Sequence, residues 1–237
     1  MNIALIIAGG RGMRMGQEIP KQFLTVEDKP VIAYTMEAFQ KHPDIDAIAV
    51  VCVEGWDSIL SAYARQYGIS KLRHIVPGGE NGQASIRNGV FELERHYAPD
   101  DLVLIHDAIR PLVSQDIISE CIATARERGS AIVAIPCQEA MLETGDQISS
   151  SRVCPRENLK RTQTPQGFPL GRIAGAHRRA LERGITNSVA SCTLMVELGE
   201  PVYFCAGSEK NIKLTTPDDM EIFRALLHLR DRQEGRQ

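Results

Sequence analysis

The chain has 237 residues, of which 43% are hydrophobic and 24% are charged, and its formal net charge at pH 7 is −3. A slightly acidic chain has no global positive field, which argues against binding to nucleic acid or to an anionic membrane surface. This length and composition are typical of one soluble globular unit, so we expect a single domain over residues 1–237.

The first segment joins an apolar run to a glycine-rich loop. Residues 3–8 are continuously apolar, as in a buried strand, and residues 8–21 read AGGRGMRMGQEIPK. Glycines let the backbone approach a polyanion closely, and successive N–H groups form a concave nest for anions. Arg14 and Lys21 add positive charge to the same loop. The segment therefore predicts a phosphate-binding loop.

Neither of the two familiar phosphate-loop patterns fits this segment. A P-loop requires Lys-Ser or Lys-Thr directly after a glycine, and the chain has no such sequence here. The dinucleotide fingerprint G-x-G-x-x-G fails because Met15 stands at its third glycine position and Gly16 comes one place late. A surface turn that is merely rich in glycine stays open as the simpler alternative.

Apolar runs and amphipathic segments alternate along the rest of the chain. The apolar runs are expected to be strands, and they cover residues 3–8, 46–53, 73–76, 102–105, 131–135 and 202–205. The amphipathic segments are expected to be helices, near residues 31–42, 55–68, 82–95, 114–127, 169–183 and 217–232. The early strands are continuous β-branched runs, which is typical of a sheet covered on both faces. We therefore predict an α/β fold with a three-layer, doubly wound, mostly parallel sheet.

Two of the loops after predicted strands have unusual compositions. Ligands of such sheets bind beyond the carboxyl ends of the strands. Residues 77–85 read PGGENGQAS, and residues 106–111 read HDAIRP. Asp107, at the end of a buried strand, is a natural oxygen ligand for Mg²⁺, and a helix N-cap is the alternative role.

One segment interrupts the alternation. Residues 137–164 are polar, irregular and strongly charged. A loop this long inside a compact domain is usually functional or contacts another subunit. The residues from 230 to the end carry five charges in eight positions, which is typical of a fraying helix end.

The cysteines indicate a reducing compartment. They show no C-x-x-C spacing and no nearby histidines, which favours buried free thiols over a zinc site. The first apolar run is too short for a signal peptide, and no run approaches transmembrane length, so we expect a cytoplasmic protein. The six positions are Cys52, Cys121, Cys137, Cys154, Cys192 and Cys205.

Five segments together resemble the CTP-dependent alditol-phosphate cytidylyltransferases, which include 2-C-methyl-D-erythritol 4-phosphate cytidylyltransferase and ribitol-5-phosphate cytidylyltransferase. They occur in the order and at the spacing of that family and cover essentially the whole chain. The segments are AGGRGMRMG and PKQF within 8–23, PGGE at 77–80 with Ser85, HDAIRP at 106–111, TPQGF at 164–168 and NIKLTTPDD at 211–219.

The resemblance implies a Rossmann-like nucleotidyltransferase fold and the Mg²⁺-dependent transfer of CMP from CTP to an alditol phosphate. The chemistry is consistent with the residues. A phosphate monoester is already anionic at neutral pH, so it needs no general base, and we find no Ser-His-Asp or Cys-His pattern. The main requirement is positive charge around two anions that must meet.

The resemblance also assigns residues to roles. The catalytic residues are Arg14, Lys21, Arg156 and Lys213, and Asp107 is the metal ligand. The nucleotide-binding residues are Ala8, Gly9, Gly10, Gly12, Gly79, Glu80 and Ser85. The acceptor-binding residues are Arg110, Ala140, Arg156, Thr164 and Lys213. Segment 137–164 corresponds to an arm that crosses to a second subunit, which implies a homodimer.

The chain departs from the family pattern at three places. Members that use methylerythritol phosphate carry Asp-Thr where this chain has Glu139-Ala140. The arginine of the family pattern is replaced by Gly82, and a Thr-Asp pair is replaced by Val189-Ala190. The altered acceptor residues favour ribitol 5-phosphate, or another alditol phosphate, over methylerythritol phosphate, the acceptor that leads to isoprenoid precursors. Two other hypotheses stay open: a sugar-1-phosphate nucleotidylyltransferase that uses another nucleotide, and a catalytically degenerate nucleotide-binding homologue.

Overall fold

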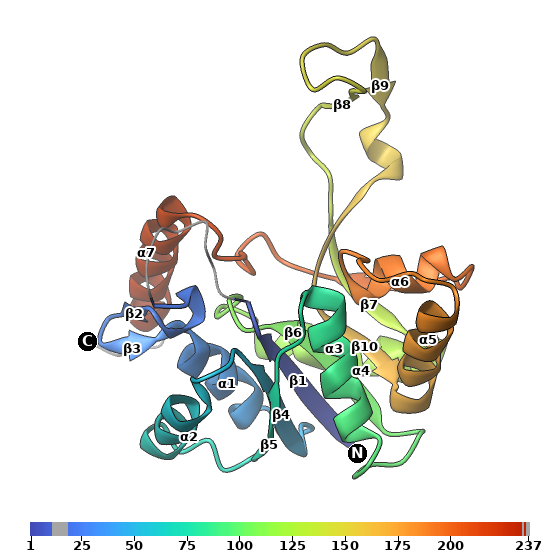
Figure 1. Cartoon of the computed structure of the whole chain (residues 1–237). Helices are drawn as coiled ribbons and strands as arrows, with labels where there is room; N and C mark the ends of the chain where they lie inside the picture. The colour runs from blue at the N-terminus through green and yellow to red at the C-terminus, as the bar shows by residue number, and fades with distance from the viewer. Residues whose placement is uncertain (11–18, 234, 236–237) are drawn as a thin grey trace.

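The computed structural model describes residues 1–10, 19–233 and 235. A seven-stranded sheet runs through the molecule in the order β11-β7-β10-β6-β1-β4-β5 (Figure 1). Neighbouring strands are parallel except for β10, which is antiparallel to both β6 and β7. The strands are β1 (Asn2–Ala8), β4 (Ala47–Cys52), β5 (Leu72–Pro77), β6 (Leu102–Asp107), β7 (Ala131–Pro136), β10 (Lys160–Pro169) and β11 (Phe204–Ala206). The predicted mostly parallel sheet is confirmed.

Helices cover both faces of the sheet. On one face α1 (Val31–Lys41), α2 (Asp57–Gln66) and α4 (Gln115–Arg128) bury their apolar sides. On the other face lie α3 (Gly82–Leu93), α5 (Leu170–Glu182) and α6 (Ser191–Glu197).

Strand β1 shows why its sequence is continuously apolar. Ala4 and Ile6 belong to the first core, whereas Ile3 and Leu5 belong to the second, and all four are fully buried. Because side chains alternate between the two faces of a strand, a strand buried on both faces needs apolar residues at every position. The predicted three-layer arrangement is confirmed.

A third, smaller core joins α7 (Pro217–Gln233) to the short hairpin of β2 (Thr25–Val26) and β3 (Lys29–Pro30). The ring of Tyr34 meets the ring of Phe223 edge-on, with their centroids 5.3 Å apart. This core fixes α7 beside α1 (Figure 1). None of the helices among the described residues is both long enough and apolar enough to cross a membrane.

The largest difference from the sequence-based prediction is strand β10. Its residues include Pro165 and Gly167, which are poor strand formers, so no strand was predicted there. The register of β10 against β7 shifts between Thr162 and Gln166, which accommodates the proline. Helix α6 was also missed, and the strand predicted at 202–205 begins later, at Phe204.

The segment after β7 projects away from the sheet as an arm, drawn in yellow (Figure 1). It is less irregular than predicted, because β8 (Met141–Glu143) and β9 (Arg152–Cys154) pair antiparallel and η3 (Arg156–Asn158) follows. Every residue from 138 to 153 is exposed. Contact of this arm with a second subunit stays a prediction.

All six cysteines are free, and five of them are buried. Cys154, on β9 of the arm, is half-buried instead, which corrects the expectation that all six would lie inside. The arm has no hydrophobic core of its own, so a residue there cannot be enclosed as the sheet residues are.

Candidate active site

The carboxyl ends of four neighbouring parallel strands meet at one edge of the sheet. Ile7 pairs with Asp107 across β1 and β6, Ala8 pairs with Cys52, and Cys52 pairs with Pro77. The loops that follow β1, β5 and β6 therefore start side by side. These are the loops that carry the sequence motifs, and this edge is where open α/β sheets bind ligands.

Glycines allow the loops after β1 and β5 to touch. A Cβ atom on Gly9 would lie 2.9 Å from Ser85 Oγ, and one on Gly79 would lie 2.6 Å from the Cβ of Ala84. Ser85 Oγ accepts the backbone N–H of Gly79 at 3.0 Å. The side chain of Asn81 caps α3 by accepting the N–H of Ala84 at 2.9 Å. The contact therefore requires small residues and leaves backbone groups and one hydroxyl around a narrow space.

The structure thus brings Gly9, Gly79 and Ser85 together. Ala8 is buried at the end of β1, whereas Glu80 is exposed on its loop. Among the described residues, no atom outside the neighbouring positions lies within 4 Å of where a Cβ on Gly10 would stand. Two predicted residues, Gly12 and Arg14, lie outside the described part of the chain.

Gln22 fixes the start of the next element, although sequence reasoning did not single it out. Its Nε2 donates to the carbonyl oxygens of Ala8 at 2.7 Å and Gly10 at 3.0 Å, and the side chain is buried. These bonds hold the short helix η2 (Lys21–Phe23) against the end of β1 and so bring Lys21 to the same sheet edge. The only sequence signal was its place between lysine and phenylalanine in the PKQF motif.

Asp107, at the end of β6, is the centre of an ionic cluster. Its Oδ2 accepts from Arg110 Nε at 3.1 Å, and Lys213 Nζ lies 3.2 Å from Oδ1 and 3.1 Å from Oδ2. Burial alone would raise the pKa of Asp107, but Lys213 and Arg110 outweigh it and hold that pKa below its usual value. We call Asp107, Arg110 and Lys213 the Asp107 cluster.

His106, buried beside the cluster, is a neutral ring, because burial lowers its pKa to about 4. Its Nε2 lies 3.1 Å from the carbonyl oxygen of Arg110, and its Nδ1 lies 3.1 Å from Thr164 Oγ1. A neutral ring satisfies both contacts by donating from Nε2 and accepting at Nδ1. Thr164 Oγ1 in turn accepts the backbone N–H of Asp107 at 3.0 Å. His106 and Thr164 therefore fix the backbone of Asp107.

The buried side chains of Gln163 and Arg110 hold the loop that carries Lys213. Gln163 Nε2 donates to the carbonyl oxygen of Ser208 at 2.8 Å, and Arg110 Nη1 donates to that of Asn211 at 2.7 Å. Gln163 and Asn211 are both buried. The sequence analysis singled out neither Gln163 nor Asn211. Gln163 directly precedes the TPQGF motif and Asn211 is the first residue of NIKLTTPDD, and these positions were the only sequence signal of a structural role.

Ala140 and Arg156, which were predicted for the acceptor site, lie on the arm, where the resemblance had placed segment 137–164. Arg156 Nη1 donates to the carbonyl oxygen of Gln138 at 2.7 Å, so it lies beside the segment that carries Ala140. Within the described residues, Arg156 makes no hydrogen bond or ion pair to the Asp107 cluster. The predicted acceptor residues therefore form two groups, one on the sheet edge and one on the arm.

A cavity of about 340 Å³ lies beside the Asp107 cluster. Its walls come from β7, β10 and the loop that leads into α7, and most of its side chains are polar. The lining residues are Arg110, Ile135, Arg161, Thr162, Gln163, Glu209, Asn211, Ile212, Lys213 and Asp219. A small polar molecule fits such a space better than an apolar one does.

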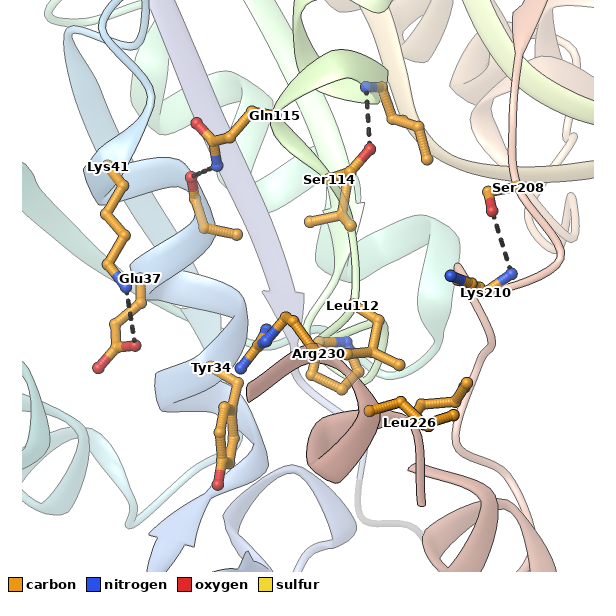
Figure 2. A pocket seen from close by; sticks show the side chains of 15 residues that line it. Tyr34, Glu37, Lys41, Leu112, Ser114, Gln115, Ser208, Lys210, Leu226 and Arg230 are labelled. Atoms are coloured by element: carbon orange, nitrogen blue, oxygen red, sulfur yellow. Dashed lines mark hydrogen bonds and ion pairs between the residues drawn. The ribbon is translucent and has the colours of Figure 1, made fainter. Parts of the chain in front are cut away.

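A larger cavity of about 600 Å³ lies between α1, α7 and the loop after β6 (Figure 2). Lys41, Lys210 and Arg230 are among its lining residues, together with the apolar Leu112 and Leu226. It contains none of the residues predicted for the site. We therefore place the candidate active site at the sheet edge, where the glycine loops and the half-buried carboxylate of Asp107 lie.

Comparisons with known proteins point to one family. Residues 2–229 match the family model described as IspD: 2-C-methyl-D-erythritol 4-phosphate cytidylyltransferase. The chain is 42% identical over 229 residues to ribitol-5-phosphate cytidylyltransferase of Lacticaseibacillus paracasei, covering 96% of this chain and 98% of the relative. It is 37% identical to 2-C-methyl-D-erythritol 4-phosphate cytidylyltransferase of Desulforamulus reducens, covering 97% of each. The crystal structure of the latter enzyme from Francisella tularensis superposes with a TM-score of 0.80 at 26% identity, covering 95% of this chain and 99% of that one.

Proposed function

The chain belongs to the 2-C-methyl-D-erythritol 4-phosphate cytidylyltransferase family, and from this we propose that it transfers CMP from CTP to an alditol phosphate. The proposal is supported by one observation above the others. Three loops far apart in sequence, at residues 9–10, 77–85 and 107–110, meet at the same sheet edge. One side of that edge is lined by glycine backbone, and the other side carries the Asp107 cluster.

In the proposed reaction a phosphate oxygen of the acceptor attacks the α-phosphorus of CTP. The bond from that phosphorus to the oxygen that bridges to the β-phosphate breaks, and pyrophosphate leaves. The acceptor phosphate has a second pKa near 6, so it is an anion at neutral pH and gives up no proton to the protein. This agrees with the bonding of His106, whose two ring nitrogens are already occupied.

The protein's part in this step is electrostatic. Lys21 and Arg14 neutralise the triphosphate, while Arg110 and Lys213 attract the acceptor phosphate. In the structure the latter two cations rest on Asp107, which keeps them in place before the substrate enters. On this proposal the cytosine ring lies beside Gly9, Gly79, Glu80 and Ser85, and the close approach of the two loops would exclude a purine.

Asp107 also fits a magnesium site. Mg²⁺ usually takes one or two protein carboxylates and completes its shell with phosphate oxygens and water. The nearby carboxylate of Asp219 instead accepts the backbone N–H groups of Thr215 and Thr216, both at 2.7 Å, at the start of α7. Asp107 is thus the residue that would hold the ion. When bound, Mg²⁺ would neutralise charge on the triphosphate.

Ribitol 5-phosphate is the acceptor that we favour. Two relatives named for ribitol 5-phosphate are 42% and 41% identical to this chain, whereas two named for methylerythritol phosphate are 37% and 38% identical. The resemblance implies a hydroxyl at this position in members that use methylerythritol phosphate, and Ala140 lacks it.

The proposed location is the cytoplasm. The use of CTP and the six free cysteines are both consistent with a reducing compartment.

We expect kcat/KM to be higher for ribitol 5-phosphate than for methylerythritol phosphate. The missing hydroxyl removes one hydrogen bond to methylerythritol phosphate, worth about 0.5–1.5 kcal/mol. Ala140→Thr should narrow the difference, whereas Ser151→Thr, elsewhere on the arm, should leave it unchanged. Pyrophosphate release is measured with each acceptor, with UTP, GTP and ATP as nucleotide controls.

A tenfold preference for methylerythritol phosphate would reverse this ranking without affecting cytidylyl transfer. CTP binding without pyrophosphate release on either acceptor would instead identify a degenerate homologue.

We also propose that the site is completed by the arm of a second copy of the chain. Arg156 and Ala140 lie on the arm, apart from the Asp107 cluster. The arm exposes apolar side chains that a monomer leaves in water, with Leu142 63% and Val153 77% exposed. A symmetric dimer buries the same surface on both copies.

Mixing two inactive variants tests this arrangement. Arg156→Ala and Lys213→Ala should each be nearly inactive alone. In a mixed dimer one site receives both wild-type residues, so random exchange should restore about a quarter of wild-type activity. Turnover is measured after the two proteins are mixed and allowed to exchange. If the mixture gains no activity although exchange is shown by a mass-tagged copy, both residues act within one chain.

A further inference from the structure

Two histidines and a glutamate gather on the outer edge of the sheet, where β5 meets the end of α3. His74 lies on β5, Glu92 is in the last turn of α3, and His96 follows the helix. One ligand atom from each of these residues lies within 4.8 Å of the other two. None of the three takes part in the site described above.

From this arrangement we infer that His74, Glu92 and His96 form a binding site for a divalent transition metal of the zinc class. Two imidazoles and one carboxylate make a donor set that zinc takes in proteins, with a fourth position left for water. The neutral imidazole is the form of histidine that binds a metal ion, through either of its two ring nitrogens.

The fold already supplies most of the required geometry. The ring centroids of His74 and His96 are 4.5 Å apart, and His96 Nε2 lies 3.1 Å from Glu92 Oε1. In a tetrahedral zinc site neighbouring ligand atoms are about 3.4 Å apart. A small side-chain rotation would bring the three ligand atoms from within 4.8 Å of one another to that separation. His96 is 44% exposed and has room for that rotation.

Neighbouring residues support the same assignment. Tyr97 OH lies 3.2 Å from His74 Nε2, and metal-binding histidines usually bond a neighbour through their other ring nitrogen. Arg95 lies 3.0 Å from Glu92 Oε2, but its side chain is 74% exposed, so this ion pair competes weakly with a metal. No cysteine belongs to the set.

The site would tie an edge strand to the helix beside it. β5 is the last strand of the sheet, and β5 and α3 are joined by the loop at residues 78–81. The three ligands lie at the other end of both elements from that loop. A bound ion would therefore stabilise the folded chain without touching the reacting groups.

The test is a titration of Zn²⁺ into the full-length protein after chelator treatment and dialysis. Millimolar Mg²⁺ is present throughout to occupy the Asp107 region. We expect one Zn²⁺ per chain and a rise in Tm of at least about 5 °C at one hundred times the Kd. His96→Ala and Glu92→Gln should each weaken the Kd about tenfold or more. Both side chains are partly exposed, so the variants should fold.

Three further measurements make the result specific. His228→Ala removes another exposed histidine, on α7, and should keep the parent Kd for Zn²⁺. Substitution with Co²⁺ should give the visible spectrum of a tetrahedral site without a thiolate charge-transfer band. His96→Ala should also keep the parent turnover with CTP, because it lies outside the reacting site. An equal Kd in the parent and His96→Ala, or a thiolate band, would overturn the assignment.

Discussion

Asp107→Asn should reduce turnover with CTP by 10²-fold or more while the protein stays folded. The amide keeps the size of the carboxylate but loses the charge that pairs with Arg110 and Lys213. It also loses the charge that a magnesium ion requires. The backbone N–H of Asp107 keeps its bond to Thr164 Oγ1, so we expect the end of β6 to keep its position.

The measurements are kcat as a function of Mg²⁺ concentration and KM for the acceptor. A need for more Mg²⁺ would assign Asp107 to the metal, whereas a raised acceptor KM would assign it to the placement of Arg110 and Lys213. Asp100→Asn, which removes an exposed carboxylate elsewhere, is the matched control. An Asp107→Asn protein as active as the parent would leave this residue only a structural role.

Lys21→Ala should lower kcat by 10²-fold or more and change KM for CTP much less. A fixed cation beside a triphosphate contributes most when charge develops on the leaving pyrophosphate. Gln22 keeps η2 attached to the end of β1 in the variant, so the effect should come from the lost charge. Single-turnover rates and KM for CTP separate the two contributions.

Lys41→Ala is the matched control, because Lys41 is an exposed lysine on α1 paired only weakly with Glu37 at 3.7 Å. If Lys21→Ala kept a turnover near that of the parent protein, the assignment of this segment as a phosphate-binding loop would be wrong. Lys21→Arg should recover part of the lost rate, because it restores the charge with a different shape.

The strands of the sheet could be predicted where burial alone determines the sequence. β1, β4 and β6 are apolar at nearly every position because both of their faces are covered, so a short window of sequence reveals them. β10 could not be found this way. It contains Pro165, and its buried Gln163 and Gln166 are polar residues whose partners are distant in sequence, such as Cys192.

The residues of the candidate site were likewise only partly predictable from the sequence. Glycine-rich motifs and the resemblance to a family, which the family match confirms, identified Gly9, Gly79, Ser85 and Asp107 as residues of interest. Their roles remain predictions that the variants above test. The supporting residues Gln22 and Asn211 were not singled out, because they act only through hydrogen bonds to other loops.

The sequence by itself thus determined the fold class, the family and the loops that carry its motifs, because these depend on local composition and spacing. Only the tertiary structure decided that Asp107 faces Lys213, 106 positions away, and that the guanidinium of Arg156 bonds the carbonyl oxygen of Gln138. It alone also brought His74 beside His96. The physical reason is that periodicity records whether a residue is buried, whereas pairing between charges and ligands depends on which elements the fold makes neighbours.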